Sequence, residues 1–251
     1  SITKKINLSI EEESPRVISF GRKSSTNSFG NFNINENTLL PVDVAPSYGI
    51  ENKNAVAVVI GNRSYKIKGV PNVEYAERDA RIFKSYLSRT LGLNENNIIY
   101  INDAQYVKFS EIFGSDSDYK GKLYSLANKD GDIYIFYSGH GVPDLNSQVG
   151  YFLPSDSDPS NINLSGYPTQ RLLQNLSFIQ KDKKTGHVSV FIDACFSGST
   201  HDGNFLIKNI SGITLKLRHQ NLIKGISLFS ASQSDQVSSW FPEARHGLFS
   251  Y

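Results

Sequence analysis

From about residue 54 onward, short apolar runs alternate with longer stretches in which apolar residues recur every three or four positions. The runs show no alternation of polar and apolar residues, which is typical of strands buried on both faces of a sheet. Five such runs are predicted to be strands: 55–60, 97–102, 132–137, 188–193 and 226–231.

Stretches with helical spacing separate these runs. Apolar residues between Val73 and Leu91 mark one face of an amphipathic helix that Gly92 closes. Further helices are predicted over 119–132 and 169–179. Buried strands separated by helices indicate a parallel sheet covered on both faces. The predicted fold class is therefore α/β, with three αβα layers and a parallel central sheet.

The chain divides unevenly. Residues 1–53 are rich in Ser, Asn and Gly and are predicted to form a weakly structured extension and linker, whereas 54–251 form the folded domain. Within that domain, residues 199–225 make a connection too long for an ordinary loop. A loop of this kind is usually functional or disordered.

Composition excludes several classes of protein. The chain has 26 Lys and Arg against 24 Asp and Glu, so we expect no nucleic-acid or membrane-surface partner. It contains no apolar run of the roughly 20 residues that span a membrane, and its start lacks the apolar centre of a signal peptide. We expect a soluble protein, with a cytoplasmic location favoured over secretion. The single cysteine cannot form an internal disulfide.

Two predicted strands run directly into residues that can do chemistry. The strand 132–137 is followed by Ser138-Gly139-His140-Gly141, and the strand 188–193 by Ala194 and Cys195. In an open parallel sheet, ligands bind beyond the carboxyl ends of the strands, and neighbouring strands lie about 4.8 Å apart. A thiol and an imidazole at adjacent strand ends can act as nucleophile and acid–base on one substrate atom.

Structural roles for these residues are the alternative. A single Cys at the end of a buried strand is more often a small core residue, and a single His beside glycines is usually structural. The conjunction of both, each just past a strand and beside Gly, favours the catalytic interpretation. No other histidine follows an apolar strand in the same way: His187, His201, His219 and His246.

The segments IYIFYSGHG (133–141) and VFIDACFSGS (190–199) resemble the two catalytic segments of caspase-like cysteine peptidases, and especially of their metacaspase and bacterial branch. Residues 55–65 and 73–83 look like the first strand and first helix of that family, and 229–240 and 246–251 like the start of its small subunit. The resemblance covers residues 54–251. His140 and Cys195 are 55 residues apart, near the spacing of about 50 in caspases.

The resemblance implies roles for individual residues. Cys195 would be the nucleophile and His140 the residue that protonates the leaving amine. The backbone N–H groups of Gly141 and Cys195 would stabilise the oxyanion. The resemblance implies a caspase-like thiol endopeptidase with a three-layer αβα caspase-like fold, whose mostly parallel central sheet has about six strands.

Substrate preference follows from a departure from true caspases, which have Gln where this chain has Asp193. In metacaspases an Asp at that place and another in the first helix, here Asp79, bind a basic P1 side chain; Ser138 also belongs to this S1 site. An unpaired buried charge costs about 2 to 5 kcal/mol, so two carboxylates would favour Arg or Lys. Alternatively, Asp79 is a solvated helix residue or pairs with Arg78 or Arg81, and Asp193 is a cap.

The long loop 199–225 suggests self-processing. Caspase relatives are often cut between their large and small subunits, as zymogens that mature by cleavage. With a basic preference, the candidate sites for autocatalytic cleavage would be Lys208, Lys216, Arg218 and Lys224. The alternative is a flexible basic loop.

Cofactors are not expected. Several metacaspases need calcium, bound in part by an acidic pair at the start of a later helix, but residues 166–170 contain no acidic residue. Asp156 and Asp158 could bind a cation, yet we expect no calcium requirement. A single cysteine and scattered histidines do not make a zinc site, and no phosphate-binding loop is present.

The expected partners are protein or peptide substrates with Arg or Lys at P1. Relatives usually continue past the point where this chain stops, at Tyr251, so a C-terminal fragment or partner chain is also expected. Two other function classes remain open. The chain could be a catalytically idle caspase-like scaffold, or a cysteine peptidase of the clostripain or gingipain type.

Overall fold

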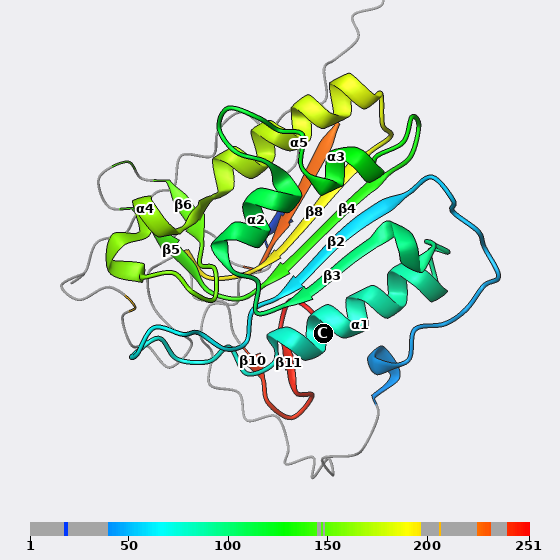
Figure 1. Ribbon diagram of the computed structural model, residues 1–251. Coiled ribbons are helices and arrows are strands. Elements are labelled where there is room, and N and C mark those ends of the chain that lie inside the picture. Colours follow the sequence, from blue (N-terminus) through cyan, green and yellow to red (C-terminus); the bar gives the residue numbers. More distant parts are fainter. Residues whose placement is uncertain are drawn as a thin grey trace, which may run out of the picture.

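A computed structural model describes residues 18–19, 40–144, 147, 149–196, 206, 225–231 and 240–251. Its central sheet has the strand order β1-β9-β8-β4-β2-β3, and every neighbouring pair is parallel (Figure 1). The α/β class and the parallel sheet predicted from the sequence are thus confirmed. The strands are β1 (Ile18–Ser19), β2 (Val56–Gly61), β3 (Ile98–Asn102), β4 (Ile133–Ser138), β8 (Val188–Asp193) and β9 (Ile226–Ser230).

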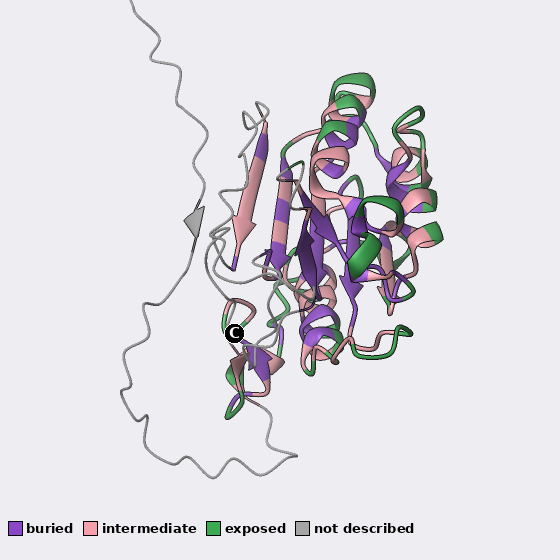
Figure 2. Cartoon of the chain, turned by 90° about the vertical axis from the view of Figure 1, so that its left-hand side faces the viewer, coloured by how far each residue is buried: buried purple, intermediate pink, exposed green. Residues whose placement is uncertain are grey.

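Helices cover both faces of this sheet. Side chains of β2 at Val56, Val58 and Ile60 pack into a core with α2 (Tyr106–Phe113), α3 (Lys122–Leu126) and α5 (Thr169–Lys183). Those at Ala57 and Val59 pack on the opposite face, against α1 (Ala76–Arg89). Figure 2 shows the result, with buried central strands between helices whose outer surfaces are exposed. The three-layer prediction is confirmed.

Two helical details differ from the sequence prediction. The helix predicted over 119–132 is reduced to α3, because Ala127 already has an extended backbone (φ −62°, ψ 130°). The helix α2 was not predicted, since it has only eight residues and ends at Gly114, whose φ is 88°. Such short helices show too few turns for a clear hydrophobic period.

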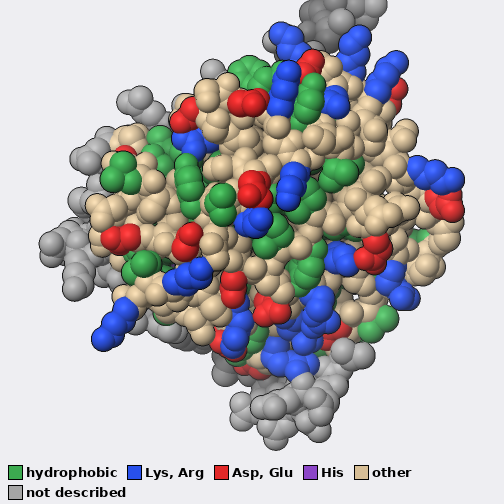
Figure 3. Space-filling model, in the orientation of Figure 1, with side chains coloured by type: hydrophobic (Ala, Val, Ile, Leu, Met, Phe, Trp, Pro, Cys, Tyr) green, Lys and Arg blue, Asp and Glu red, His purple; other side chains and the backbone are tan. Residues whose placement is uncertain are grey.

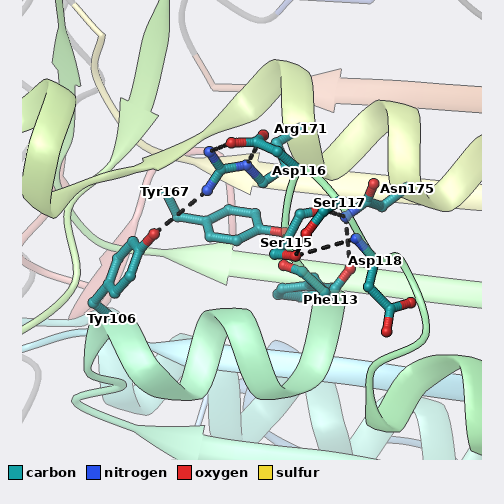
Figure 4. A network of polar contacts seen from close by, with 10 residues as sticks. Tyr106, Phe113, Ser115, Asp116, Ser117, Asp118, Tyr167, Arg171 and Asn175 are labelled. Atoms are coloured by element: carbon teal, nitrogen blue, oxygen red, sulfur yellow. Dashed lines mark hydrogen bonds and ion pairs between the residues drawn. The ribbon is translucent and has the colours of Figure 1, made fainter.

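Polar contacts fasten the end of α2 to α5 (Figure 4). The guanidinium of Arg171 forms a two-pronged ion pair with Asp116. Deeper in, the side-chain amide of Asn175 donates to the carbonyls of Phe113 at 2.9 Å and Ser115 at 3.1 Å. These bonds satisfy backbone carbonyls at the helix end that have no partner within the helix.

Short elements that the sequence did not predict surround the main sheet. The strands β5 (Gly141–Pro143), β6 (Gly150–Phe152) and β7 (Tyr167–Pro168) form a small antiparallel sheet, and β10 (Trp240–Phe241) pairs with β11 (His246–Gly247). Strands of two or three residues are too short to produce an alternating pattern. The remaining helical turns are α4 (Ile162–Ser165), η1 (Pro41–Asp43), η2 (Glu95–Asn97) and η3 (Pro159–Asn161).

The segment 40–53 belongs to the predicted weakly structured linker, but some of its residues form hydrogen bonds with side chains at the end of α1. Arg89 donates to the carbonyl of Ala45 at 3.0 Å, and Thr90 to that of Pro46 at 2.7 Å. Further upstream, β1 pairs with β9 at the edge of the sheet. Polar side chains that bond to backbone carbonyls leave no hydrophobic pattern, so this contact could not be predicted from the sequence. The division of the chain after residue 53 stays a prediction.

The loop predicted over 199–225 falls largely outside the described residues, and so do Lys208, Lys216, Arg218 and Lys224. Leu206 is described and packs with Val142, Leu153 and Ile162. Basic and acidic side chains are interspersed over the face seen in Figure 3. Within the described part of the chain, no helix has both the length and the apolar character needed to cross a membrane.

Candidate active site

The strands β4 and β8 bring the two candidate catalytic segments to one edge of the sheet. They are parallel neighbours, and their last paired residues are Ser138 and Asp193. His140 and Cys195 each follow two residues later. An ideal Cβ built on Gly141 would lie only 2.7 Å from the carbonyl oxygen of Cys195, so the two segments are in direct contact. A side chain at position 141 would force them apart.

Three hydrogen bonds fix the backbone of His140. Its N–H donates to the hydroxyl of Tyr65 at 2.8 Å, while its carbonyl accepts from the N–H of Leu153 at 3.0 Å and from the hydroxyl of Tyr137 at 2.7 Å. The imidazole Nε2 lies 2.8 Å from the carbonyl oxygen of Pro71. Since a carbonyl only accepts, Nε2 carries the proton and Nδ1 holds the lone pair.

Burial of the His140 ring lowers its pKa from the usual 6.5 to about 4, an effect that the bond to Pro71 opposes. The residue is 7% exposed, and the ring of Tyr65 lies 4.8 Å from the imidazole between centroids. The imidazole is therefore neutral at neutral pH. A neutral imidazole with a defined tautomer can take a proton from a thiol through Nδ1.

Cys195 is partly exposed, between the buried side chains of Ala194 and Phe196. A core cysteine in a buried strand would be inaccessible, so this placement opposes the purely structural interpretation. The phenyl ring of Phe196 packs beneath the site against Phe152, with 6.0 Å between centroids. Cys195 is thus partly exposed and is followed by a side chain that is fixed in the core.

Asp79 and Asp193 converge on one glycine. Asp79 lies in the first turn of α1 and Asp193 at the end of β8, and they are 3% and 5% exposed. Asp79 Oδ2 accepts the N–H of Gly247 at 2.9 Å. A Cβ on Gly247 would overlap Asp193 Oδ2 and lie 3.2 Å from Asp79 Oδ2. The hydroxyl of Ser250 donates to Asp193 at 2.6 Å. The two carboxylates predicted to share a site therefore lie near each other.

Of the alternatives for Asp79, a solvated helix residue is excluded, because the side chain is buried. The guanidinium of Arg78 bonds to Asp43 at 2.7 Å and acts on Asp79 only through its charge. Burial raises the pKa of Asp79 above its ordinary value, although hydrogen bonds from His246 and Gly247 and the charge of Arg78 oppose this. Charge on this carboxylate therefore depends on its neighbours.

Ser138, the third residue predicted for the S1 site, is 2% exposed and ends β4. It lies between Gly61 of β2 and Asp193 of β8 in the same row of the sheet. This placement puts it beside one of the two carboxylates. Its role in binding stays a prediction, as do the oxyanion roles of Gly141 and Cys195.

Four residues that contact the site were not predicted. Tyr65 and the carbonyl of Pro71 hold His140, whereas His246 contacts Asp79 and Asp43 contacts His246. Backbone carbonyls leave no signature in a sequence, and Asp43 lies in the predicted linker. The pair His246-Gly247 was considered only as a rival for the catalytic base.

The remaining histidines lie elsewhere. His187 precedes β8, at the opposite edge, and its Nε2 lies 2.9 Å from the hydroxyl of Ser227. His246 is buried at the β10–β11 hairpin beside α1, shown in red in Figure 1. His201 and His219 fall outside the described residues.

Asp156 and Asp158, the candidate cation ligands, are used as caps. Asp156 accepts the N–H of Tyr106 at 2.9 Å, and Asp158 accepts the N–H of Ser160 at 2.8 Å at the start of η3. Over the described residues, no group of three or more His, Cys, Asp or Glu is arranged to hold a metal ion. The expectation of no calcium requirement stays a prediction.

A family profile described as the caspase domain matches residues 54–251. Solved structures similar to the chain include caspase-1 from Spodoptera frugiperda, at 17% identity and a TM-score of 0.45, with 84% of this chain and 72% of that one covered. Another, described as pro-sf-caspase-1, has 11% identity and a TM-score of 0.41, with 85% and 74% covered. A comparison with curated proteins found no match. Because the profile covers most of the sequence, including both segments of the candidate site, the chain belongs to the caspase-domain family, and that family implies a cysteine peptidase.

Proposed function

We propose that the chain is an endopeptidase in which Cys195 and His140 form the catalytic dyad and which cleaves after Arg or Lys. The observation that carries the dyad is the pairing of Ser138 with Asp193, which sets the two segments side by side at the carboxyl ends of β4 and β8. The specificity is supported by the convergence of Asp79 and Asp193 on Gly247. The domain would comprise residues 54–251.

Catalysis would proceed through an acyl-enzyme. The thiol of Cys195 gives its proton to Nδ1 of His140, and the sulfur attacks the scissile carbonyl carbon. The C–N bond breaks as the imidazolium protonates the leaving amine. Water then attacks the thioester, the same imidazole accepts its proton, and that proton returns to the sulfur as the acid leaves. Burial favours the neutral imidazole, so it drives the transfer to the amine.

Backbone N–H groups would stabilise the oxyanion, from Cys195 itself and from Gly141. The close approach of Gly141 to Cys195 supports this, because both N–H groups belong to segments in direct contact. Loss of one such donor costs about 10²- to 10³-fold in rate in other enzymes. A Gly at 141 also lets a substrate backbone come near.

A basic P1 residue would bind between Asp79 and Asp193. Both carboxylates are buried and acidic, and Gln would stand at position 193 in a true caspase. This favours the metacaspase and bacterial branch of the family. Self-processing at Lys208, Lys216, Arg218 or Lys224 would follow from the same preference, and intact mass of wild type beside Cys195→Ala over time tests it.

Fluorogenic peptides that differ only at P1 test the proposal. Wild type should release fluorophore after Arg and Lys, and Cys195→Ala should not. Absence of turnover with every peptide would favour an idle scaffold. Preference for Asp at P1 would overturn the assignment of the pocket while leaving the dyad intact.

A further inference from the structure

A buried histidine links the candidate P1 site to the segment that precedes the caspase domain. His246 is 0% exposed and lies between two carboxylates. Its Nδ1 contacts Asp79 Oδ1, and its Nε2 lies 2.9 Å from Asp43 Oδ1. Nothing in the catalytic steps proposed above uses this residue.

Both ring nitrogens of His246 have an acidic partner. Each nitrogen faces a carboxylate oxygen, and an ionised carboxylate only accepts hydrogen bonds. A neutral imidazole has one N–H and can serve one of the two carboxylates, whereas an imidazolium serves both. Burying two carboxylates side by side without a cation between them would be strongly unfavourable.

Neighbouring charges complete a balanced cluster. Arg78 donates to the second oxygen of Asp43 at 2.7 Å, and the N–H of Leu40 donates to the same oxygen at 2.8 Å. Two basic side chains, Arg78 and His246, thus face two acidic ones, Asp43 and Asp79. Burial raises the pKa of Asp43, but the bonds from Leu40, His246 and Arg78 outweigh it, so the net effect is a lowered pKa.

The cluster also sets the direction of the Asp79 carboxylate. His246 holds Oδ1, so Oδ2 is turned toward Gly247, whose N–H it accepts. A Cβ at Gly247 would also overlap Asp193 Oδ2, so the carboxylates of Asp79 and Asp193 approach the same glycine. A small rotation of Asp79 would therefore change the spacing between the two groups proposed to bind a basic side chain.

We propose that His246, as an imidazolium bridging Asp43 and Asp79, is a positioning residue that determines the preference for a basic P1 side chain. This inference rests on the proposed function. It makes Asp43 part of the specificity machinery, although that residue precedes the matched caspase domain. The segment 40–46 then contributes to substrate choice without touching substrate.

Peptides with Arg or citrulline at P1 test the role, because citrulline has nearly the shape of Arg without its charge. In wild type, kcat/KM should favour Arg strongly. In His246→Gln, which keeps one donor, the Arg-to-citrulline ratio should fall about tenfold, chiefly through a higher KM for Arg. Asp43→Asn should lower the ratio by about threefold, since the imidazolium loses one anionic partner.

Glu95→Gln is the matched control. Glu95 pairs with Lys84 of α1 at 2.6 Å on the surface, so the variant removes an acidic partner of the same helix away from the site. Its ratio should equal that of wild type. Thermal unfolding of each variant checks folding, and if His246→Gln fails to fold, Asp43→Asn decides: an unchanged ratio overturns the inference.

Nitrogen-15 NMR of histidine-labelled Cys195→Ala protein gives a readout without activity. Two protonated ring nitrogens on His246 at neutral pH are expected, and a neutral ring would overturn the inference. The failures are distinguishable. A wild type that does not prefer Arg over citrulline defeats the proposed function, whereas a wild type that does, with an undiminished ratio in His246→Gln, defeats this inference alone.

Discussion

Two parts of the candidate site have different kinds of partner. The dyad side comprises His140 and Cys195, and the P1 side comprises Asp79 and Asp193, which are proposed to bind the P1 residue of the substrate. Around His140 the partners are neutral: the hydroxyl of Tyr65, the carbonyl of Pro71 and the backbone of Leu153. Around Asp79 the partners are titratable: a ring nitrogen of His246, from the β10–β11 hairpin, contacts its carboxylate. Asp43, from the segment before the domain, bonds to the other ring nitrogen and to Arg78. In the proposed mechanism His140 changes its charge during turnover, and burial keeps it neutral at rest. Asp79, proposed to bind a basic side chain, instead has a titratable partner in His246.

The comparison also concerns distance along the chain. Adjacent parallel strands place the dyad, so its geometry depends on the sheet. The P1 side is assembled from the beginning and end of the described chain, with Asp43 and His246 meeting at α1. We therefore expect changes at the dyad to act on kcat and changes at the P1 side to act on KM and substrate choice.

The largest expected effect is that of Cys195→Ala. The thioester cannot form without the sulfur, so turnover of an Arg peptide should fall by about 10⁴-fold or more, to background. Because the residue is partly exposed, thermal unfolding should be nearly unchanged. Residual turnover within tenfold of wild type would show that another residue is the nucleophile.

Asp193→Asn should weaken the binding of a basic P1 residue and leave the dyad unchanged. Loss of one of two buried carboxylates should lower kcat/KM for Arg peptides by about 30- to 1000-fold. Citrulline peptides should be affected far less, because they carry no charge to pair. Equal losses for both peptides would mean that Asp193 supports the fold of the site rather than its charge preference.

Acid should weaken the fold through His140. Its folded pKa of about 4 lies below the usual 6.5, so the unfolded chain binds a proton first as pH falls. The contribution of this group is present above pH 6.5 and is lost progressively toward pH 4, on the order of 3 kcal/mol in total. Urea unfolding between pH 7 and pH 4 measures it.

His140→Gln is the comparison for that titration, because it has no titrating ring. The difference in unfolding free energy between wild type and this variant should narrow, or turn against wild type, as pH falls below 6.5. A difference that stays constant from pH 7 to pH 4 would contradict the placement of a buried neutral imidazole.

Tyr65→Phe should have the smallest of these effects. The N–H of His140 loses its acceptor in a buried place, which costs about 1 to 3 kcal/mol of stability. The ring that packs against the imidazole is kept, so we expect kcat to fall by about tenfold or less with KM unchanged. Measured unfolding free energies and steady-state kinetics check both expectations; a KM effect without a kcat effect would contradict the assignment of Tyr65 to the dyad side.

The different origins of the two sides explain what could be predicted from the sequence. Apolar runs without alternation predicted β4 and β8, and their last residues fixed the place of His140 and Cys195. Ligand binding beyond the carboxyl ends of parallel strands is a general rule, whereas the adjacency of β4 and β8 came from the structure. That part of the site was predictable because it depends on local pattern and on the geometry common to all such sheets.

The rest depends on contacts that no local pattern encodes. Asp43 sits in a stretch without hydrophobic periodicity, and His246 belongs to a two-residue strand. Pro71 acts through a carbonyl that every residue possesses. The role of Asp79 was predicted from the family resemblance. Its partner His246 could not be predicted, because polar contacts between residues far apart in the chain produce no periodic pattern in the sequence.

The most direct test is labelling with a peptide that carries Arg at P1 and a thiol-reactive group in place of the scissile bond. The intact mass of the protein should rise by one adduct, peptide mapping should place it on Cys195, and the citrulline analogue should label far more slowly. No adduct on Cys195, or equal labelling by both analogues, would contradict a cysteine peptidase whose dyad and acidic P1 site act together.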